Sequence, residues 1–426
     1  VAAKLPLTTA IQRALERNPD LKVARAKIEE SEAARRKIVN AYYPDVKAVG
    51  QYVRNSDEAK FDIGQMASGI GAAMGLPIKI DPSKAPPPTI IQAYNQFAGI
   101  LSVDQTIFAA APLLYDKASE KGIGAQRIGT QAAEREIAYQ MSVVYYNIAG
   151  LDRIIVAAGR AVELAQKRID LLQKRKAAGT ESDLPMLRAE VEQARAEQDV
   201  LRATLGKKQL LEVIGMLTSD APPEDIEAPP PQTRPAGSYD QWLQKTLADR
   251  PDLAARRQAV EAQRALVVEA EYRWLPMLAA QGVYRWSNVK GFTDSNTLWQ
   301  VTANLVVPIF DRGQRYADAR ERRVTLLRLQ AEVEKAEADL KAQLRQVAHE
   351  VQLAENVVKI AAKQAEIARR GAEIAAKSQI AGVTTHLEVD EAETNLRLAD
   401  ANVEREKANL DLAVLKLRHL VGDVRP

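Results

Sequence analysis

Apolar residues recur with helical spacing along two long stretches of the chain. From residue 326 to 375 they are separated by three or four positions, which is the heptad spacing of helices packed side by side. The same spacing occurs 203 positions earlier, from residue 137 to 172. A second apolar stripe follows the later one at Leu353, Val357, Ile360, Ile367 and Ile374. Two stripes on one helix indicate contact with a neighbour on each side, whereas a two-stranded coiled coil needs only one.

The sequence also predicts where these helices end. A glycine that suits the left-handed end of a helix is followed by a residue that can cap the next helix: Gly179 with Ser182 or Asp183, and Gly382 with Thr384 or Thr385. Each half is therefore expected to hold a long helix, a tight turn and a second helix of about 35 residues. The predicted long helices span about 113–177 and 315–380, and shorter helices at about 20–42 and 252–274 begin at a proline and end before one.

The apolar period changes from 3.6 to two directly after Pro44 and Pro276. The alternating segments lie at 46–52, 97–103, 278–284 and 299–307. Each predicted strand of about ten residues has one apolar and one polar face, which suits a tilted strand between lipid and water. All five phenylalanines lie in or beside these segments, as aromatic residues do at membrane interfaces. A soluble antiparallel sheet with one face on a core fits any single strand equally well.

One pattern is written twice along the chain. Asn18-Pro19-Asp20-Leu21 returns as Arg250-Pro251-Asp252-Leu253 at an offset of 232, and Ile107-Phe108 returns as Ile309-Phe310. A duplication of this size favours equivalent halves standing side by side in one shell or ring. Because two hairpins leave open edges that lipid does not tolerate, we expect three copies to supply twelve strands for one closed barrel.

The duplication predicts the domain organisation. The first structural repeat covers 1–216, with a β-hairpin at about 45–108 and a helical hairpin turning at 179. A Pro-rich linker covers 217–238, and the second repeat covers 239–426, with a β-hairpin at about 277–309 and a helical hairpin turning at 382. The first hairpin is longer because of residues at about 57–95, whose Gly-rich and Pro-rich composition predicts an exposed loop.

Composition narrows the classes of function. The 59 basic and 56 acidic residues nearly balance, which gives no case for binding nucleic acid. The absence of cysteine from the sequence excludes disulfides, thiolate metal sites and a cysteine nucleophile. No run approaches the roughly 20 apolar residues of a transmembrane helix, so membrane insertion is expected only through strands. The chain opens on Val1 rather than Met, which favours a processed chain.

The sequence does not offer a set of catalytic groups. His349-Glu350 begins like the helix motif of zinc proteases, but Leu353 stands where the second histidine belongs. The glycines at 69, 71 and 75 lack the spacing of a dinucleotide-binding fingerprint. A nucleophile, a base and an orienting group cannot be assembled from the remaining residues. We therefore expect no enzyme, no cofactor and no metal site.

One polar cluster follows the second helical turn, at Glu388, Asp390 and Glu391. A threefold assembly would multiply these acids into rings. Acids in the first turns of a helix also interact favourably with its dipole, without any further role. The residues alone leave both interpretations open.

Taken together, these motifs resemble the TolC-like outer membrane efflux protein family over essentially the whole chain. The most specific pieces are the openings at 18–21 and 250–253, Tyr43-Pro44, Leu275-Pro276, Val307-Pro308-Ile309-Phe310, and the turns Ala178-Gly179-Thr180 and Ala381-Gly382-Val383. The resemblance implies a mostly α-helical chain with a membrane β-barrel portion, built from a duplicated helix–strand–strand–helix unit. It further implies a homotrimer whose 12-stranded barrel lies in the lipid of the bacterial outer membrane and continues into a long α-helical barrel across the periplasm.

The resemblance also implies a function and a set of partners. Family members are the outer membrane channel-tunnels of tripartite efflux or type I secretion systems. They are passive exit ducts for substrates that an inner-membrane pump delivers through a periplasmic adaptor. The adaptor is expected at the helix tips, at Gly179, Thr180, Gly382 and Val383. The rival interpretations are a non-channel structural coiled coil and the periplasmic adaptor itself, although an adaptor carries one helical hairpin rather than two equivalent units.

The family pattern assigns a periplasmic aperture to the acidic cluster. In well-known members, acids six and nine positions after the second turn glycine line the constriction, and these positions are Glu388 and Glu391 here. With Asp390 between them, the three residues are the expected gate. The corresponding positions of the first half are Pro185 and Arg188, so the acidic character belongs to one repeat. Thr384 replaces a basic residue that some members carry, which argues against a latch built on that position.

Overall fold

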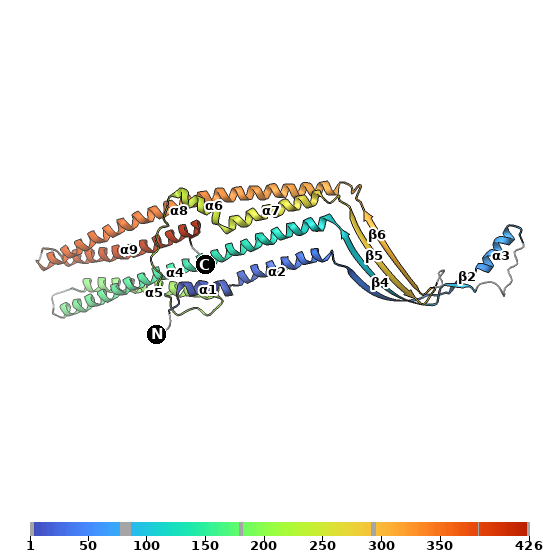
Figure 1. Ribbon diagram of the computed structural model, residues 1–426. Coiled ribbons are helices and arrows are strands. Elements are labelled where there is room, and N and C mark those ends of the chain that lie inside the picture. The colour runs from blue at the N-terminus through green and yellow to red at the C-terminus, as the bar shows by residue number, and fades with distance from the viewer. Residues whose placement is uncertain (1–3, 77–86, 179–181, 291–294, 382, 424–426) are drawn as a thin grey trace. The chain divides into compact units, whose positions relative to one another are not determined.

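The computed structural model describes residues 4–76, 87–178, 182–290, 295–381 and 383–423, in which long helices alternate with strands (Figure 1). The helices are α1 (Leu7–Arg17), α2 (Pro19–Asn40), α3 (Ile63–Ala73), α4 (Ala110–Ala177), α5 (Asp183–Thr218), α6 (Tyr239–Asp249), α7 (Pro251–Glu271), α8 (Gln314–Ile380) and α9 (His386–Val421). The strands are β1 (Asp45–Arg54), β2 (Ala59–Phe61), β3 (Thr89–Gln92), β4 (Asn95–Phe108), β5 (Met277–Ser287) and β6 (Thr297–Val306). The mostly helical fold with a strand portion confirms the predicted fold class.

The chain divides into two compact units, each assembled from both halves of the sequence. The first, called here the helical unit, contains Val1–Glu30, Ile123–Val260 and Arg328–Pro426. The second, called here the strand unit, contains Ser31–Gly122 and Glu261–Leu327. The division into two sequence repeats and a linker, with the bounds given above, remains a prediction.

The strand unit is built on a four-stranded antiparallel sheet in the order β1-β4-β5-β6. Gly50 lies opposite Gly99 in the first hairpin, and Gly282 lies opposite Val301 in the second. These four positions correspond under the offsets of 232 and 202 that relate the repeated motifs. The two hairpins therefore share one register, and β1 and β6 are the edges of the sheet within the described residues.

Prolines and side-chain alternation explain where the strands form. Pro44 and Pro276 follow the ends of α2 and α7, and the residue before a proline is driven out of the helical region. Tyr52, Tyr284 and Trp299 are exposed, and each has a polar residue on one side of it in the chain. An apolar face left exposed beside a polar face suits a sheet placed between lipid and water.

The residues predicted as a loop at about 57–95 form regular structure in part, so that prediction was wrong. β2 and β3 pair in antiparallel fashion, and α3 lies between them in the chain. The side chain of Asp62 accepts a hydrogen bond from the Gln65 amide at 3.0 Å, which caps α3. Glycine weakens a helix but does not forbid one, and this cap and the β-ladder outweigh that weakness. Residues 77–86 lie outside the described part.

The core of the helical unit is made by helices from both ends of the chain. One cluster gathers α1, α2, α4 and α5 around Tyr145, Ile148 and Ile214, which are fully buried. A second gathers α6, α8 and α9 around Trp242, Leu344 and Leu417. The sequence pattern missed the short helices α1 and α6, since helices of 11 residues depend on tertiary packing rather than on their own stability.

The repeated Asn/Arg-Pro-Asp-Leu motif has a structural role in the helical unit. Leu21 and Leu253 are buried in both copies. In the first copy, the buried Asn18 amide donates to the Leu217 carbonyl at 3.1 Å, and its side-chain oxygen accepts from the Asp20 amide. In the second copy, Arg250 donates two hydrogen bonds to Asp252, at 2.9 and 2.8 Å. The motif thus starts α2 and α7 and fixes each to the core by its leucine.

One helix within the described residues, α4, is long and apolar enough by length and composition to cross a membrane. The expectation that no helix reaches this limit was therefore too narrow. The same composition occurs in core helices of soluble units, and 44% of the most apolar window of α4 is buried in the protein. Core packing accounts for part of its hydropathy.

Candidate functional site

The first helical turn lies between α4 and α5. Lys176 and Asp183 form an ion pair of 2.5 Å across it, which joins the last turn of α4 to the start of α5. Ser182 precedes α5 in an extended conformation but makes no side-chain capping bond. Gly179 and Thr180, predicted as adaptor contacts, lie outside the described residues.

The second helical turn lies between α8 and α9. The Val383 amide donates to the Ser378 carbonyl at 2.9 Å, which is the bond that closes a Schellman motif. Val383, a predicted adaptor contact, is exposed, whereas Gly382 lies outside the described residues. Thr385 and Glu388 then form a capping box, in which each side chain accepts from the other residue's amide.

The three predicted aperture residues do not share one environment. Glu388 and Glu391 are both exposed, and residues three apart lie on one face of a helix. Asp390 lies on another side of α9, next to the buried Val389. Helix geometry therefore separates Asp390 from the two glutamates.

Asp390 forms an ion pair with Arg168 of α4. Both side chains are largely shielded, with 21% of Arg168 and 18% of Asp390 exposed. Glu393, one turn farther along α9, lies 3.9 Å from the same guanidinium. The contact joins the hairpin of the first half to the hairpin of the second.

A second pair in the same region connects α5 with α9. Arg397 donates to Glu192 at 2.9 Å, and Thr394 donates to the same carboxylate at 3.3 Å. Arg397 also donates to the Thr394 hydroxyl, while its Nε is buried without a hydrogen-bond partner in the described part of the chain. The start of α9 is thus held by two arginine–carboxylate pairs to the first hairpin.

Burial and the neighbouring carboxylates have opposite effects on the pKa of the Arg168 guanidinium. Burial lowers the pKa of the Arg168 guanidinium, because the charged form loses hydration. The carboxylates of Glu192 and Glu393 raise it, and the positive charge of Arg397 lowers it. The cluster is therefore an alternating arrangement of charges in which each cation stands beside carboxylates.

Sequence reasoning named one member of this cluster and missed the others. Asp390 was predicted as a gate residue on its position after the turn, whereas the sequence pattern did not single out Arg168, Glu192 or Arg397. The one local signal is that Arg168 precedes Ile169, which belongs to the apolar seam. The partners lie more than 200 residues apart in sequence, so only the fold brings them together.

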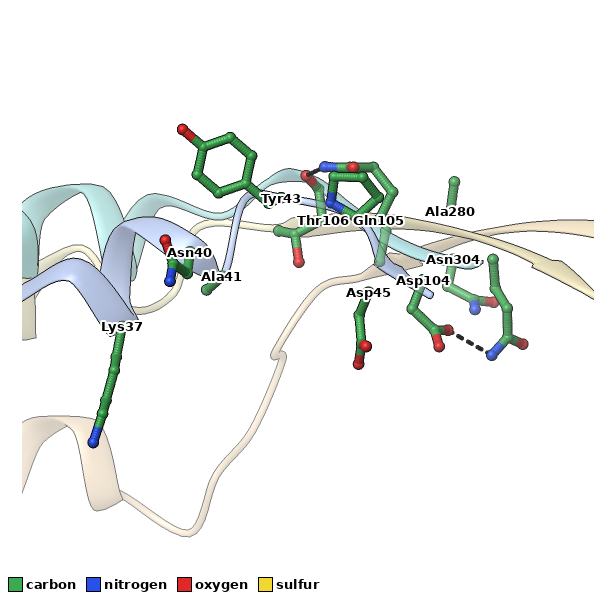
Figure 2. Close-up of a pocket in the computed structure, with 13 residues that line it drawn as sticks. Lys37, Asn40, Ala41, Tyr43, Asp45, Asp104, Gln105, Thr106, Ala280 and Asn304 are labelled. Carbon is green, nitrogen blue, oxygen red and sulfur yellow. Dashed lines mark hydrogen bonds between the residues drawn. The ribbon is translucent and has the colours of Figure 1, made fainter. Parts of the chain in front are cut away.

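The strand unit has a polar hollow of about 810 Å³ where α2 gives way to the sheet. Asp45 and Asp104 lie opposite each other in β1 and β4, and Asp104 accepts from Gln281 of β5 at 2.6 Å. Figure 2 shows Lys37 and Asp45 pointing to one side of the chain and Tyr43 to the other. Positively and negatively charged side chains line this side, as expected of a surface that faces water.

The sequence matches the family model described as "Outer membrane efflux protein" over residues 10–213 and 242–423. Among curated proteins, the cobalt-zinc-cadmium resistance protein CzcC of Cupriavidus metallidurans is 30% identical over 165 residues. That match spans 38% of this chain and 38% of the length of CzcC.

Solved structures resemble the whole fold. CusC has a TM-score of 0.78 at 16% identity, with 97% of this chain and 91% of CusC covered. VceC from Vibrio cholerae has a TM-score of 0.76 at 17% identity, with 98% of this chain and 96% of VceC covered. At these identities the likeness concerns the fold.

Proposed function

Because the chain belongs to the outer membrane efflux protein family and is a protein of the outer membrane, we propose that it forms a trimeric, passive exit duct. Three copies close a 12-stranded barrel in the membrane, and their helices continue as a tunnel into the periplasm. An inner-membrane pump supplies the energy and a periplasmic adaptor joins pump to duct. Such a duct needs no catalytic group, and its family is one of channels rather than enzymes.

The observation that carries this proposal is the four-stranded sheet with β1 and β6 at its edges. Unpaired strand edges do not persist in the hydrocarbon of a membrane, because their amides and carbonyls have no other hydrogen-bond partners there. Within one chain β4 pairs with β5, and the equivalent strands in the repeat are β6 and β1. The partner for β6 is therefore β1 of the next protomer. Four strands from each of three copies make twelve, an even number as in other bacterial barrels.

The shared register of the hairpins predicts which residues meet between copies. Ser102 of β4 lies opposite Val283 of β5 within one chain. Under the repeat offsets of 202 and 232, the equivalent residues are Asn304 of β6 and Gln51 of β1. Asn304 of one protomer should therefore face Gln51 of the next.

Disulfide cross-linking tests this contact directly, since the chain has no native cysteine. Asn304→Cys combined with Gln51→Cys should give covalent trimers on oxidation. Within one chain the two positions are at least three strand spacings, about 14 Å, apart, which is too far for a disulfide. Asn304→Cys with Lys47→Cys is the matched control, because Lys47 lies four residues, about 13 Å, along β1. Monomers or dimers alone from the first pair would contradict the trimeric barrel.

The helical turns are the proposed docking site for the adaptor. The exposure of Val383 supports this, together with the closed turn that holds it. Val383→Asp should abolish export in cells while the purified trimer remains intact. Val191→Asp, at another exposed apolar residue outside the turns, is the control. Normal export by the Val383 variant would remove this residue from the docking site.

The start of α9 is the proposed aperture. Glu391 and Glu388 of three copies would form an acidic ring, which favours cations. Asp390 has a different task in this proposal: its pair with Arg168 holds α9 against the first hairpin. The aperture would then be closed while this pair is intact in the three copies, and it would open when the pair breaks.

We further propose divalent metal cations as the first cargo to test. The likeness to a protein named for cobalt, zinc and cadmium resistance supports this class, and an acidic ring favours cations over anions. Deleting the gene from its host should lower tolerance to these three metals, and the intact gene should restore it. Unchanged metal tolerance with lost tolerance to organic compounds would assign another cargo.

A further inference from the structure

The loop between β6 and α8 carries the two most exposed large hydrophobic side chains of the described residues. Ile309 is 86% exposed and Phe310 is 81% exposed. They follow the edge strand β6 directly, so part of this surface will be covered when another copy pairs with that edge. The question is how much remains after assembly.

The first repeat shows how much of such a surface stays exposed, because its neighbouring hairpin is already present in the chain. Ile107 and Phe108 are the equivalents of Ile309 and Phe310, and Phe108 lies opposite Leu278 of β5. Even with β5 beside them, 54% of Ile107 and 41% of Phe108 stay exposed. Pairing between copies would therefore leave about half of the Ile309–Phe310 surface uncovered by protein.

Two arginines make the second loop different from the first. Arg312 and Arg315 follow Phe310, whereas the equivalent positions of the first repeat are Ala110 and Leu113. Arg312 is exposed and makes no ion pair within the described part of the chain. Only the second repeat thus places an available cation two residues after its exposed aromatic ring.

The loop holds this cation in a defined position. The Gln314 amide donates to the Asp311 carbonyl at 3.2 Å, and both central residues have positive φ, 59° at Arg312 and 83° at Gly313. Arginine is rare at such a turn position, which favours glycine, asparagine or aspartate. The Asp311 carboxylate accepts from the amides of Gly313 and Arg315, both at 3.1 Å. An arginine kept at a disfavoured position of a braced turn indicates a use for its charge.

Arg315 lies beside the apolar pair. Its guanidinium donates to the Ile309 carbonyl at 3.4 Å and lies 5.1 Å from the centre of the exposed Tyr316 ring. Its Nε is buried and lacks a hydrogen-bond partner among the described residues, although it lies 4.0 Å from the Asp311 carboxylate as an ion pair. The loop and the first turn of α8 therefore join an apolar tip, two guanidiniums and a tyrosine within eight residues, from 309 to 316.

Aromatic residues surround this end of the sheet. Met277 lies opposite Val306, so the segment that carries the exposed Trp274 reaches the same end as the loop after β6. Tyr43, which precedes β1, is also exposed and points away from the polar side that carries Lys37 and Asp45 (Figure 2). Aromatic residues with this placement are typical of the boundary between hydrocarbon and headgroups.

We propose that the segment at 307–316, which comprises the loop after β6 and the first turn of α8, is a lipid anchor for an anionic phospholipid. Ile309 and Phe310 enter the hydrocarbon edge of the leaflet on the helical side of the barrel. Arg312, supported by Arg315, binds the headgroup phosphate, as guanidiniums do. The anchor rests on the proposed barrel, and it assigns the charge-bearing lipid contact to the second repeat alone.

A spin label at position 310 tests the apolar half of the anchor, and the cysteine-free chain allows one label per protomer. Phe310→Cys is labelled with a nitroxide in trimers reconstituted into phosphatidylcholine–phosphatidylglycerol vesicles. Collisions with oxygen should exceed those with a water-soluble nickel chelate. Leu305→Cys on the apolar face of β6 and Val383→Cys at the helical turn give the lipid and water references. Access to the nickel chelate at position 310 would overturn the proposal. Shielding from both reagents with spin–spin broadening would assign the surface to a contact between copies and overturn it too.

The substitution Arg312→Asn tests the charged half, because asparagine suits the left-handed backbone and removes only the cation. Native mass spectrometry of trimers released from the same vesicles reports the ratio of retained phosphatidylglycerol to phosphatidylcholine. Losing one cation near an anionic lipid should lower this ratio about fivefold per site. Arg320→Asn, an exposed arginine farther along α8, should leave it unchanged. An unchanged ratio for Arg312→Asn, or loss of the lipid on adding inorganic phosphate alone, would overturn a lipid headgroup site.

The two proposals fail in different ways. If the anchor is wrong and the duct is right, these variants keep both the Asn304–Gln51 cross-link and single-channel conductance while the label or the lipid ratio gives the contrary result. If the duct is wrong, the chain carrying only Asn304→Cys and Gln51→Cys gives no covalent trimer, and the unsubstituted protein gives no conductance.

Discussion

Arg168 of α4 and Asp390 of α9 form an ion pair between segments 222 residues apart in the sequence. The pair stands where the second hairpin begins, and both side chains are mostly shielded from water. Removing one partner of a shielded pair leaves the other charge without compensation, which costs more than the pair itself contributes. This contact therefore sets how firmly the start of α9 is held against the first hairpin.

Breaking this pair should open the proposed aperture. Arg168→Gln and Asp390→Asn are each expected to raise single-channel conductance in planar bilayers and to cost about 1–3 kcal/mol of stability, below the range of fully buried pairs. The double variant should resemble either single variant, since both remove one interaction. Glu366→Gln, which breaks an exposed pair with Arg370 on α8, is the control and should change neither quantity. Strictly additive effects would show that the two residues act separately.

Glu391 should carry the cation preference of the duct. Glu391→Gln removes an exposed charge that makes no ion pair within the described residues, so permeability for potassium over chloride should fall without loss of stability. Glu388→Gln is the matched variant, because glutamine at this position also completes a capping box and keeps the helix start. A fall in selectivity for both variants extends the ring to Glu388. Unchanged selectivity in both would remove the acidic ring.

Acid should loosen the contact between the linker and α5. Burial raises the pKa of Asp225, but its hydrogen bonds to Lys207 and Lys4 outweigh this and lower the pKa to about 2. A carboxylate with a lowered folded-state pKa stabilises the fold above its unfolded value, near 3.8, and loses this contribution as pH falls toward 2. We expect a contribution of about 1–2 kcal/mol at neutral pH, allowing for partial solvent screening.

The substitution Asp225→Asn checks that contribution. Heat denaturation followed by circular dichroism should show a lower midpoint at pH 7 and a flatter dependence between about pH 4 and pH 2. Asp220→Asn removes a carboxylate from a pair in which Arg17 is about half exposed, so it should lower the midpoint less. A midpoint that falls equally between pH 4 and pH 2 in the Asp225 variant and the unsubstituted protein would contradict this role.

The leucine of the repeated motif should be needed for folding rather than for transport. Leu21→Ala removes a fully buried side chain from the core around Tyr145 and should cost about 2–5 kcal/mol. Leu253→Ala should behave similarly, because Leu253 is the equivalent leucine of the second copy and is buried to the same degree. Denaturant unfolding of the purified protein gives both values. A cost below about 1 kcal/mol at either site would mean that the surrounding helices collapse onto the cavity.

Much of the fold was predictable because it is written in local periods. The heptad seams predicted α4 and α8 to within three residues at each end, and Pro44 and Pro276 marked the change to strands. The paired motifs predicted equivalent hairpins, which the structure has in one shared register. Short elements were missed, namely α1, α6 and the β2–α3–β3 segment. These have too few residues for a periodic signal and depend on caps, ladder pairs and tertiary packing.

The candidate site divides along the same line. The position of Glu388, Asp390 and Glu391 after the turn was visible in the sequence, and helix spacing alone separates Asp390 from the two glutamates. The partners Arg168, Glu192 and Arg397 were not visible, since each resembles an ordinary surface charge when seen in isolation.

The sequence by itself determined the helices, the strands and their duplication, because backbone geometry repeats every 3.6 or two residues and leaves that period in the side chains. Only the tertiary structure decided which charges meet and which apolar residues stay uncovered. Those outcomes depend on how distant helices and strands pack, and a local period contains no information about a partner two hundred residues away.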